Sequence, residues 1–215
     1  MKDIKILFQG DSITDGNRNK DKKLRWDGNH QIGHSYAFSV CGMLALKFPD
    51  IRFSFENRGI SGNTIGKILR RADRDIINIK PDILTLLCGI NDGPVWGRKP
   101  TPPKDFAYRY EKLLQKCRQS LPDLKIILLE PFYFPVKPHD KYSEQWAKVL
   151  LQYRNIIKNL AEKYNAVYIP LQEKFDKASK NTDMEYWLWD GIHPSEQGHG
   201  IIAAELFAVL KNCMN

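Results

Sequence analysis

The sequence predicts an α/β protein, organised as a single three-layer α/β/α domain on a five-stranded parallel sheet. Short apolar runs alternate along the chain with longer segments of helical periodicity, which is typical of a parallel sheet covered on both faces. The 215 residues contain no internal repeat or linker and would make two poorly filled cores if they were divided. We therefore expect one domain over residues 1–215, with the flavodoxin-like strand order 2-1-3-4-5.

The expected strands are short and rich in branched or aromatic residues, and turn-forming residues follow each of them. In chain order they are Ile4–Phe8, Ile51–Glu56, Asp82–Cys88, Leu124–Glu130 and Ala166–Pro170. Asp82–Cys88 is apolar almost throughout, as expected for a central strand that is buried on both faces.

Helical spacing of apolar residues appears between the strands. The expected helices are His34–Phe48, Thr64–Ile79, Lys104–Ser120, Lys141–Tyr164, Leu171–Lys180 and Ser195–Asn212. Ser195 is a suitable N-cap for the last of them. Polar or Pro-rich composition predicts loops without helix at Asp15–Gly33, Gly93–Pro103 and Pro131–Asp140.

The net charge of +8 invites the hypothesis of a nucleic-acid partner. However, the basic residues alternate with acidic ones, as in Arg70–Asp75 and Lys158–Lys163. Such mixed runs are typical of solvated helix faces, and no nucleic-acid-binding motif is recognisable. We therefore expect no nucleic-acid partner.

No apolar run approaches the length of about 18 residues that a membrane span needs, so no membrane partner is expected. The N-terminus enters a strand pattern at once and lacks the features of a signal peptide. Four cysteines form no CxxC pair, which favours free thiols over a metal site. These observations predict a cytoplasmic protein without a metal or other cofactor.

Three polar motifs follow the first three strands. They are Gly10-Asp11-Ser12, Asn57–Thr64 and Gly89-Ile90-Asn91-Asp92. In the order 2-1-3 these strands are neighbours, and the carboxyl ends of parallel strands share one edge of the sheet. Ser12, Gly62 and Asn91 should therefore converge on one site.

This set of groups suits acyl transfer. If the Ser12 Oγ attacks an ester carbonyl, negative charge develops on the carbonyl oxygen and needs donors aimed at it in advance. The backbone N–H groups of Ser12 and Gly62 and the side-chain amide of Asn91 can form this oxyanion hole. Glycine at position 62 leaves room for close approach of the substrate.

A fourth motif, Asp190-Gly191-Ile192-His193, precedes the last helix. A serine nucleophile needs a base to accept its proton and a carboxylate to orient that base, and His193 and Asp190 meet these needs. Each motif alone is common in turns, but all four together, each beside a strand end or a helix start, indicate a catalytic site.

The expected site loops also contain aromatic residues, of which Trp96, Tyr133 and Trp189 are candidate substrate-binding residues. Aromatic side chains belong to the core more often than to a binding surface. A flat aromatic surface outside the core would suit a sugar ring.

These four motifs resemble those of the SGNH hydrolase superfamily, also called the GDSL esterases and lipases. The resemblance extends over nearly the whole chain and implies Ser12 as nucleophile. It also implies Ser12, Gly62 and Asn91 as oxyanion donors, with Asp190 and His193 completing the triad. The longer strings around these motifs are similar to a bacterial subgroup that contains intracellular acetylxylan esterases, and this similarity implies a homo-oligomer.

The resemblance implies a serine esterase that hydrolyses short-chain esters of acetylated sugars or xylo-oligosaccharides, so the expected partner is a small-molecule ester. Two alternatives stay open. The same machinery could serve a lysophospholipase or an acyl thioesterase. A carbohydrate-binding protein with a vestigial site is the non-enzymatic alternative, although the intact motifs argue against it.

Overall fold

The computed structural model describes residues 2–21, 28–94, 97–135 and 143–214. It confirms a five-stranded parallel sheet with the order β2-β1-β3-β4-β5. The strands are β1 Lys2–Gly10, β2 Ile51–Asn57, β3 Ile83–Leu87, β4 Lys125–Leu129 and β5 Val167–Ile169. The carboxyl end of each strand lies within two residues of the predicted end.

The register of the sheet places the polar motifs side by side. Phe8 on β1 lies opposite Asn57 on β2 and Thr85 on β3. Gly10 lies opposite Leu87, the last residue of β3. The three segments that follow these strands therefore leave the sheet at one edge.

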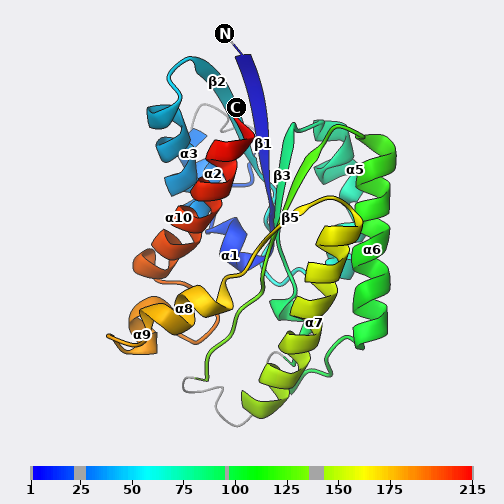
Figure 1. Cartoon of the computed structure of the whole chain (residues 1–215), viewed down its shortest axis with the longest axis vertical. Helices are drawn as coiled ribbons and strands as arrows, with labels where there is room; N and C mark the ends of the chain where they lie inside the picture. The colour runs from blue at the N-terminus through cyan, green and yellow to red at the C-terminus, as the bar shows by residue number, and fades with distance from the viewer. Residues whose placement is uncertain (1, 22–27, 95–96, 136–142, 215) are drawn as a thin grey trace.

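Helices cover both faces of the sheet (Figure 1). One layer contains α3 and α10, which pack against each other, and the other contains α4, α6 and α7. The helices are α1 Ser12–Asp15, α2 Gly28–Ile32, α3 Tyr36–Lys47, α4 Ile65–Arg70, α5 Ala72–Asp75, α6 Pro103–Ser120, α7 Ser143–Lys163, α8 Gln172–Ala178, α9 Met184–Trp187 and α10 Glu196–Cys213. Ser195 caps α10, because its side chain accepts from the backbone N–H of Gly198.

Two expectations about helices are wrong. The helix expected over Thr64–Ile79 is broken at Arg71, which ends α4 and begins α5, and a short 3₁₀ turn follows at Ile77–Ile79. Apolar spacing continues across this break, so periodicity alone does not detect it. The stretch Asp15–Gly33, expected to be loop throughout, contains the five-residue helix α2.

The core lies between the sheet and its two helical layers. Side chains of Ile6, Leu7 and Phe8 on β1 are fully buried, and those of Leu84 and Leu86 on β3 are equally inaccessible. Burial on both faces explains why these strands are apolar runs without alternation.

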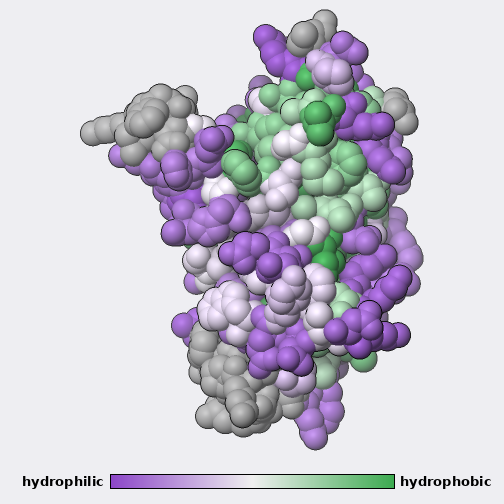
Figure 2. Space-filling model, turned by 90° about the vertical axis from the view of Figure 1, so that its left-hand side faces the viewer, coloured by the Kyte–Doolittle hydropathy of each residue, from purple (hydrophilic) through white to green (hydrophobic). Residues whose placement is uncertain are grey.

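The outer surfaces of the two helical layers differ. Figure 2 shows an apolar area on the upper part of the face that α3 and α10 form. On α3, Phe38 and Leu46 are 46% and 87% exposed, and Lys47 is the one charged residue of this helix. None of the helices in the described ranges has the length and apolar character needed to cross a membrane.

Candidate active site

The turn after β1 presents Ser12 at the first position of α1. Asp11 caps this short helix, since its Oδ1 accepts from the backbone N–H of Ile13 at 3.1 Å. A Cβ atom at Gly10 would lie 2.2 Å from Thr14 Oγ1 and 2.5 Å from the Leu87 carbonyl oxygen. Only glycine fits this position, and the chain can therefore turn sharply enough to place Ser12 at the edge of the sheet.

The Asp190–His193 motif folds into a tight turn. Gly191 has φ +82°, a conformation that favours glycine. Asp190 Oδ1 accepts from the backbone N–H groups of Ile192 at 3.0 Å and of His193 at 2.7 Å. Asp190 Oδ2 lies 2.7 Å from His193 Nδ1. One carboxylate thus fixes both the backbone and the ring of His193.

Ser12 and His193 meet although 181 residues separate them in the chain. The Ser12 Oγ lies 2.9 Å from His193 Nε2. Burial alone would lower the pKa of His193, but the hydrogen bond and charge of Asp190 outweigh burial and leave this pKa above its ordinary value. Burial would raise the pKa of Asp190, whereas its bonds to His193 hold it below the ordinary value. The arrangement is a Ser–His–Asp chain with the ionised carboxylate stabilising the histidine cation.

Gly62 and Asn91 lie in the loops after β2 and β3. Gly62 has φ +73°, and a Cβ added there would meet no atom within 4 Å, so this position opens onto free space. Asn91 Nδ2 donates to the Asn63 carbonyl oxygen at 3.3 Å. Asp92 Oδ2 accepts from the Ile65 N–H at 2.8 Å. The adjacent residues of the two loops are therefore hydrogen-bonded to each other.

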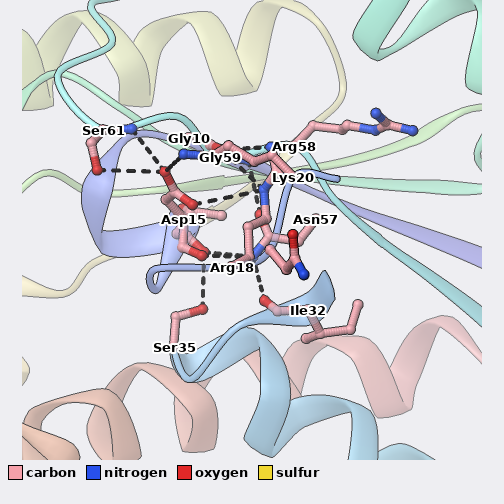
Figure 3. A network of polar contacts seen from close by, with 12 residues as sticks. Gly10, Asp15, Arg18, Lys20, Ile32, Ser35, Asn57, Arg58, Gly59 and Ser61 are labelled. Carbon is pink, nitrogen blue, oxygen red and sulfur yellow. Dashed lines mark hydrogen bonds and ion pairs between the residues drawn. The ribbon is translucent and has the colours of Figure 1, made fainter. Parts of the chain in front are cut away.

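A buried polar network holds the loop after β2 against α1 (Figure 3). Asp15, 1% exposed, accepts through Oδ2 from Lys20 Nζ at 2.7 Å and from the Ser61 N–H at 3.1 Å. Asn57 Nδ2 donates to the Thr14 carbonyl oxygen at 2.7 Å. The contacts join α1, which begins with Ser12, to the loop that contains Gly62. Asn57 is part of the Asn57–Thr64 motif and Asp15 begins the expected loop Asp15–Gly33, but the sequence alone does not reveal this bracing role.

Two buried carboxyl groups near the nucleophile have unusual titration. Burial raises the pKa of Asp11 to about 7 and that of Asp92 to about 6. In Asp11, Oδ2 is buried and has no hydrogen-bond partner among the described residues, while the nearby charge of His193 acts to lower the pKa of the group. Asp11 is therefore a titrating neighbour of the Ser12–His193 pair.

The three candidate substrate-binding aromatics have different environments. Trp189 is 61% exposed, and its ring is stacked on that of His193 with 5.4 Å between the centroids. Tyr133 is only 6% exposed and stacks on Trp146 with 4.6 Å between the centroids, so its ring packs in the core. Trp96 lies outside the described residues. Of these three candidates, Trp189 is therefore the one that the structure shows open to solvent beside His193.

A cavity of about 490 Å³ lies elsewhere, between the segment after α1 and the edge strand β2. Its lining includes Arg18, Phe38, Phe55 and Arg58, but none of the candidate catalytic or oxyanion residues. This cavity is therefore separate from the hydrogen-bonded Ser12–His193 pair. Within the described ranges, no cluster of three histidine, cysteine or acidic residues is arranged to hold a metal ion.

The sequence matches the model of the GDSL-like lipase/acylhydrolase family over residues 8–201. The chain belongs to this family. It is 33% identical over 205 residues to the acetylxylan esterase of Geobacillus stearothermophilus, an alignment that covers 93% of this chain and 90% of that enzyme. Membership of the family and this relative make the protein a carboxylic ester hydrolase, so the non-catalytic alternative is set aside.

Solved structures agree with this assignment. The crystal structure of the Geobacillus stearothermophilus acetylxylan esterase superposes with a TM-score of 0.80 at 28% identity, covering 95% of this chain and 93% of that one. A Parabacteroides merdae protein described as a GDSL-like lipase superposes with a TM-score of 0.84 at 30% identity, covering 95% and 94%. The fold of this GDSL family member is thus that of its esterase relatives.

Proposed function

We propose that this GDSL hydrolase cleaves acetyl esters of sugars or xylo-oligosaccharides through an acyl-enzyme. The observation that carries the mechanism is the chain of contacts from Ser12 Oγ to His193 Nε2, 2.9 Å, and from His193 Nδ1 to Asp190 Oδ2, 2.7 Å. Two related structures are described as catalytic mutants of the Geobacillus acetylxylan esterase, one at a serine and one at a histidine, which supports the same roles for Ser12 and His193 here.

In the first half-reaction, the Ser12 Oγ forms a bond to the ester carbonyl carbon while His193 Nε2 takes the hydroxyl proton. The carbonyl oxygen becomes an oxyanion, held by the N–H groups of Ser12 and Gly62 and by the Asn91 amide. Collapse of this intermediate breaks the ester bond, and His193 passes its proton to the departing alcohol. The acyl group stays on Ser12.

In the second half-reaction, neutral His193 takes a proton from water as the water oxygen attacks the acyl carbon. The same donors hold the second oxyanion, and the proton returns to Ser12 as the carboxylic acid leaves. Throughout, Asp190 holds the His193 tautomer and stabilises the imidazolium ion that forms twice in the cycle.

Two features support a sugar acetate as the substrate. Trp189 is open to solvent beside His193, where an alcohol leaving group would have to lie, and its flat indole suits a sugar ring. The described part of the segment after α1 is polar, with Arg18 and Lys20 held in the Asp15 network. Each methylene of a longer acyl chain needs apolar cover to gain about 0.8 kcal/mol, and this segment provides little.

The test is a series of p-nitrophenyl esters from acetate to octanoate, followed by acetylated xylo-oligosaccharides. We expect kcat/KM to be highest for acetate and to fall steeply by hexanoate. An optimum at octanoate would favour the lysophospholipase or thioesterase alternative and overturn the sugar proposal.

The role of Trp189 is tested separately. Trp189→Ala should reduce kcat/KM for the acetylated oligosaccharide about fivefold, since stacking contributes about 1 kcal/mol, and should affect p-nitrophenyl acetate much less. Tyr108→Ala is the matched control, because Tyr108 on α6 is equally exposed at 62%. Equal effects of the two variants on the oligosaccharide would contradict a specific role for Trp189.

A further inference from the structure

Arg71 lies in a mixed run of charges that the sequence analysis interpreted as a solvated face, and for Arg71 and Asp75 this interpretation is wrong. Their side chains are 10% and 4% exposed. The break between α4 and α5 occurs at Arg71 itself, and the side chain turns inward toward the carboxyl ends of β1 and β2.

Three of the guanidinium N–H groups donate to the loop after β2 and to the carboxylate of Asp75. Arg71 Nε donates to Asn63 Oδ1 at 2.9 Å. Nη1 donates to the Arg58 carbonyl oxygen at 2.9 Å and to Asp75 Oδ2 at 2.8 Å. The two ends of the loop that carries Gly62 are therefore held by one side chain.

The other two N–H groups bind the end of β1. Arg71 Nη2 donates to Gln9 Oε1 at 2.6 Å and to the Gly10 carbonyl oxygen at 3.4 Å. Gln9 Oε1 also accepts from the N–H of Gly10 at 3.0 Å. Because a guanidinium has five N–H donors in a rigid plane, every donor of Arg71 is engaged, and the plane sets the distance between β1 and the loop.

These anchor points lie within two residues of two expected oxyanion donors, Ser12 and Gly62. Gly10 precedes Ser12 by two residues, and Asn63 follows Gly62. The carbonyl oxygen of Asn63 is also the acceptor for Asn91 Nδ2 at 3.3 Å. Through these contacts, a single guanidinium reaches the supports of all three donors without touching the substrate position.

We propose that Arg71 is a positioning residue for the oxyanion hole, which sets the spacing between the backbone N–H of Ser12 and that of Gly62. This inference rests on the proposed function. Lysine cannot replace Arg71, because its single ammonium group cannot reach both segments with planar, forked donors. A displaced N–H weakens stabilisation of the oxyanion, while binding of the neutral ester depends on it far less.

The experiment compares Arg71→Lys with Arg74→Lys. Arg74 is the matched control because it pairs with the same Asp75, at 2.8 and 2.7 Å, but its side chain is 70% exposed and touches neither loop. Circular dichroism and the Tm establish that each variant is folded. We expect Arg71→Lys to lower kcat for p-nitrophenyl acetate by about 10- to 100-fold, somewhat less than removal of a whole donor, with KM changed less than about threefold.

Two readouts separate positioning from general damage. A boronic acid that forms a tetrahedral adduct on Ser12 should bind Arg71→Lys more weakly by the same factor as the loss in kcat/KM. The acid limb of the pH–rate profile should not move, since Arg71 does not contact His193 or Asp190. In the double variant with Asn91→Ala, the losses should be less than multiplicative.

If Arg71→Lys does not fold, Asn63→Ala tests the same link, because it removes one anchor and leaves the Arg71–Asp75 pair in place. The inference is overturned if kcat stays at the wild-type level, if Arg74→Lys loses as much, or if boronate affinity is unchanged while the rate falls. Ser12→Ala run in parallel separates the two hypotheses: an active Ser12→Ala refutes the proposed function itself, whereas an inactive one together with a fully active Arg71→Lys refutes only the role of Arg71.

Discussion

The nucleophilic role proposed for Ser12 depends on what surrounds its hydroxyl group, because a serine hydroxyl alone is a weak nucleophile. Its oxygen is within hydrogen-bond distance of His193, and it lies at the start of α1, where backbone N–H groups point outward. His193 in turn is 31% exposed, so it can exchange protons with water and substrate, while its partner Asp190 is 8% exposed. Solvent accessibility thus decreases from the imidazole of His193 to the carboxylate of Asp190.

The first prediction concerns the identity of the nucleophile. Ser12→Ala should abolish turnover of p-nitrophenyl acetate and leave the Tm nearly unchanged, because a single hydroxyl that is only partly buried contributes little to the core. A serine-directed organophosphonate should add its mass to the Ser12 peptide in intact protein and not in the variant. Mass spectrometry that found the label on another serine would contradict the assignment.

The second prediction concerns pH. His193 must be neutral to accept the proton of Ser12, so activity should fall on the acid side as His193 binds a proton. Asp190 raises the pKa of His193, and Asp190→Asn should therefore shift the acid limb to lower pH. The rate at neutral pH should also fall by about 10³- to 10⁴-fold through loss of ring orientation. The measurement is kcat/KM from pH 4.5 to 9.

Asp11 is the control for this experiment, because its pKa of about 7 could produce a limb in the same range. Asp11→Asn keeps an oxygen to accept from the Ile13 N–H and removes the titrating carboxyl. Its acid limb should shift only slightly downward, because Asp11 makes a small contribution to raising the pKa of His193. If the acid limb of the kcat/KM profile disappears in Asp11→Asn, the group that titrates in this limb is Asp11 and not His193.

At the scale of the elements, α10 packs against the segment that contains Asp190 and His193. The helix begins shortly after the Asp190–His193 turn, and Gly198 in its first turn packs closely on Trp187 and Pro194, which flank that turn. A Cβ at Gly198 would lie 2.1 Å from the Trp187 carbonyl oxygen. Gly200 on the same helix and Gly42 on α3 are different, since a Cβ at either would meet no atom within 4 Å.

This contrast yields the third prediction. Gly200→Ala and Gly42→Ala should each raise the free energy of unfolding by about 0.5–1 kcal/mol, because alanine favours a helix interior and restricts the unfolded chain. Gly198→Ala, two residues from Gly200, should lower it, because the helix must move away from Trp187. Urea denaturation of the three variants checks the signs. A stability loss in Gly200→Ala equal to that in Gly198→Ala would contradict the packing described here.

At the scale of the whole molecule, α3 and α10 are joined by His199. Its Nδ1 accepts from the backbone N–H of Tyr36 at 3.2 Å, a bond that needs an unprotonated ring nitrogen. Burial lowers the pKa of His199 to about 4. Below about pH 6.5, the ordinary value for histidine, the unfolded chain takes up a proton that the folded chain refuses. Stability from this group is therefore lost as the pH falls toward 4.

The fourth prediction isolates this contribution. Asp11 and Asp92 have raised pKa values and act in the opposite sense, since they favour the folded state as they become protonated, so the wild-type profile alone is ambiguous. His199→Asn retains an acceptor for Tyr36 and cannot titrate. As the pH falls from 6.5 to 4.5, the wild type should lose more stability, or gain less, than His199→Asn, because only the wild type contains the titrating ring. Urea midpoints of both proteins at each pH measure this difference.

The homo-oligomer that the family resemblance implies stays a prediction. Sedimentation velocity at several protein concentrations measures it directly. An assembly should show a mass that is a multiple of the 24.9 kDa chain.

The sequence by itself determined the order of the strands, the edge of the sheet where the motifs meet, and the family. These features depend on local periodicity, on turn-forming residues and on short motifs, all of which lie within a few neighbouring residues. The same local signals placed the cap of α10 at Ser195 correctly.

Only the tertiary structure decided which polar and aromatic residues turn inward. Arg71 appeared as one charge in a mixed run, yet its partners Gln9 and Gly10 lie more than 60 residues away in the chain. Tyr133 and Trp189 were both expected as aromatic residues in the site loops. In the structure, Tyr133 is buried against Trp146, whereas Trp189 is exposed. Whether a side chain is buried depends on which distant segments of the chain pack against it. For this reason, no local sequence pattern could show that Arg71 and Tyr133 are buried while Trp189 is exposed.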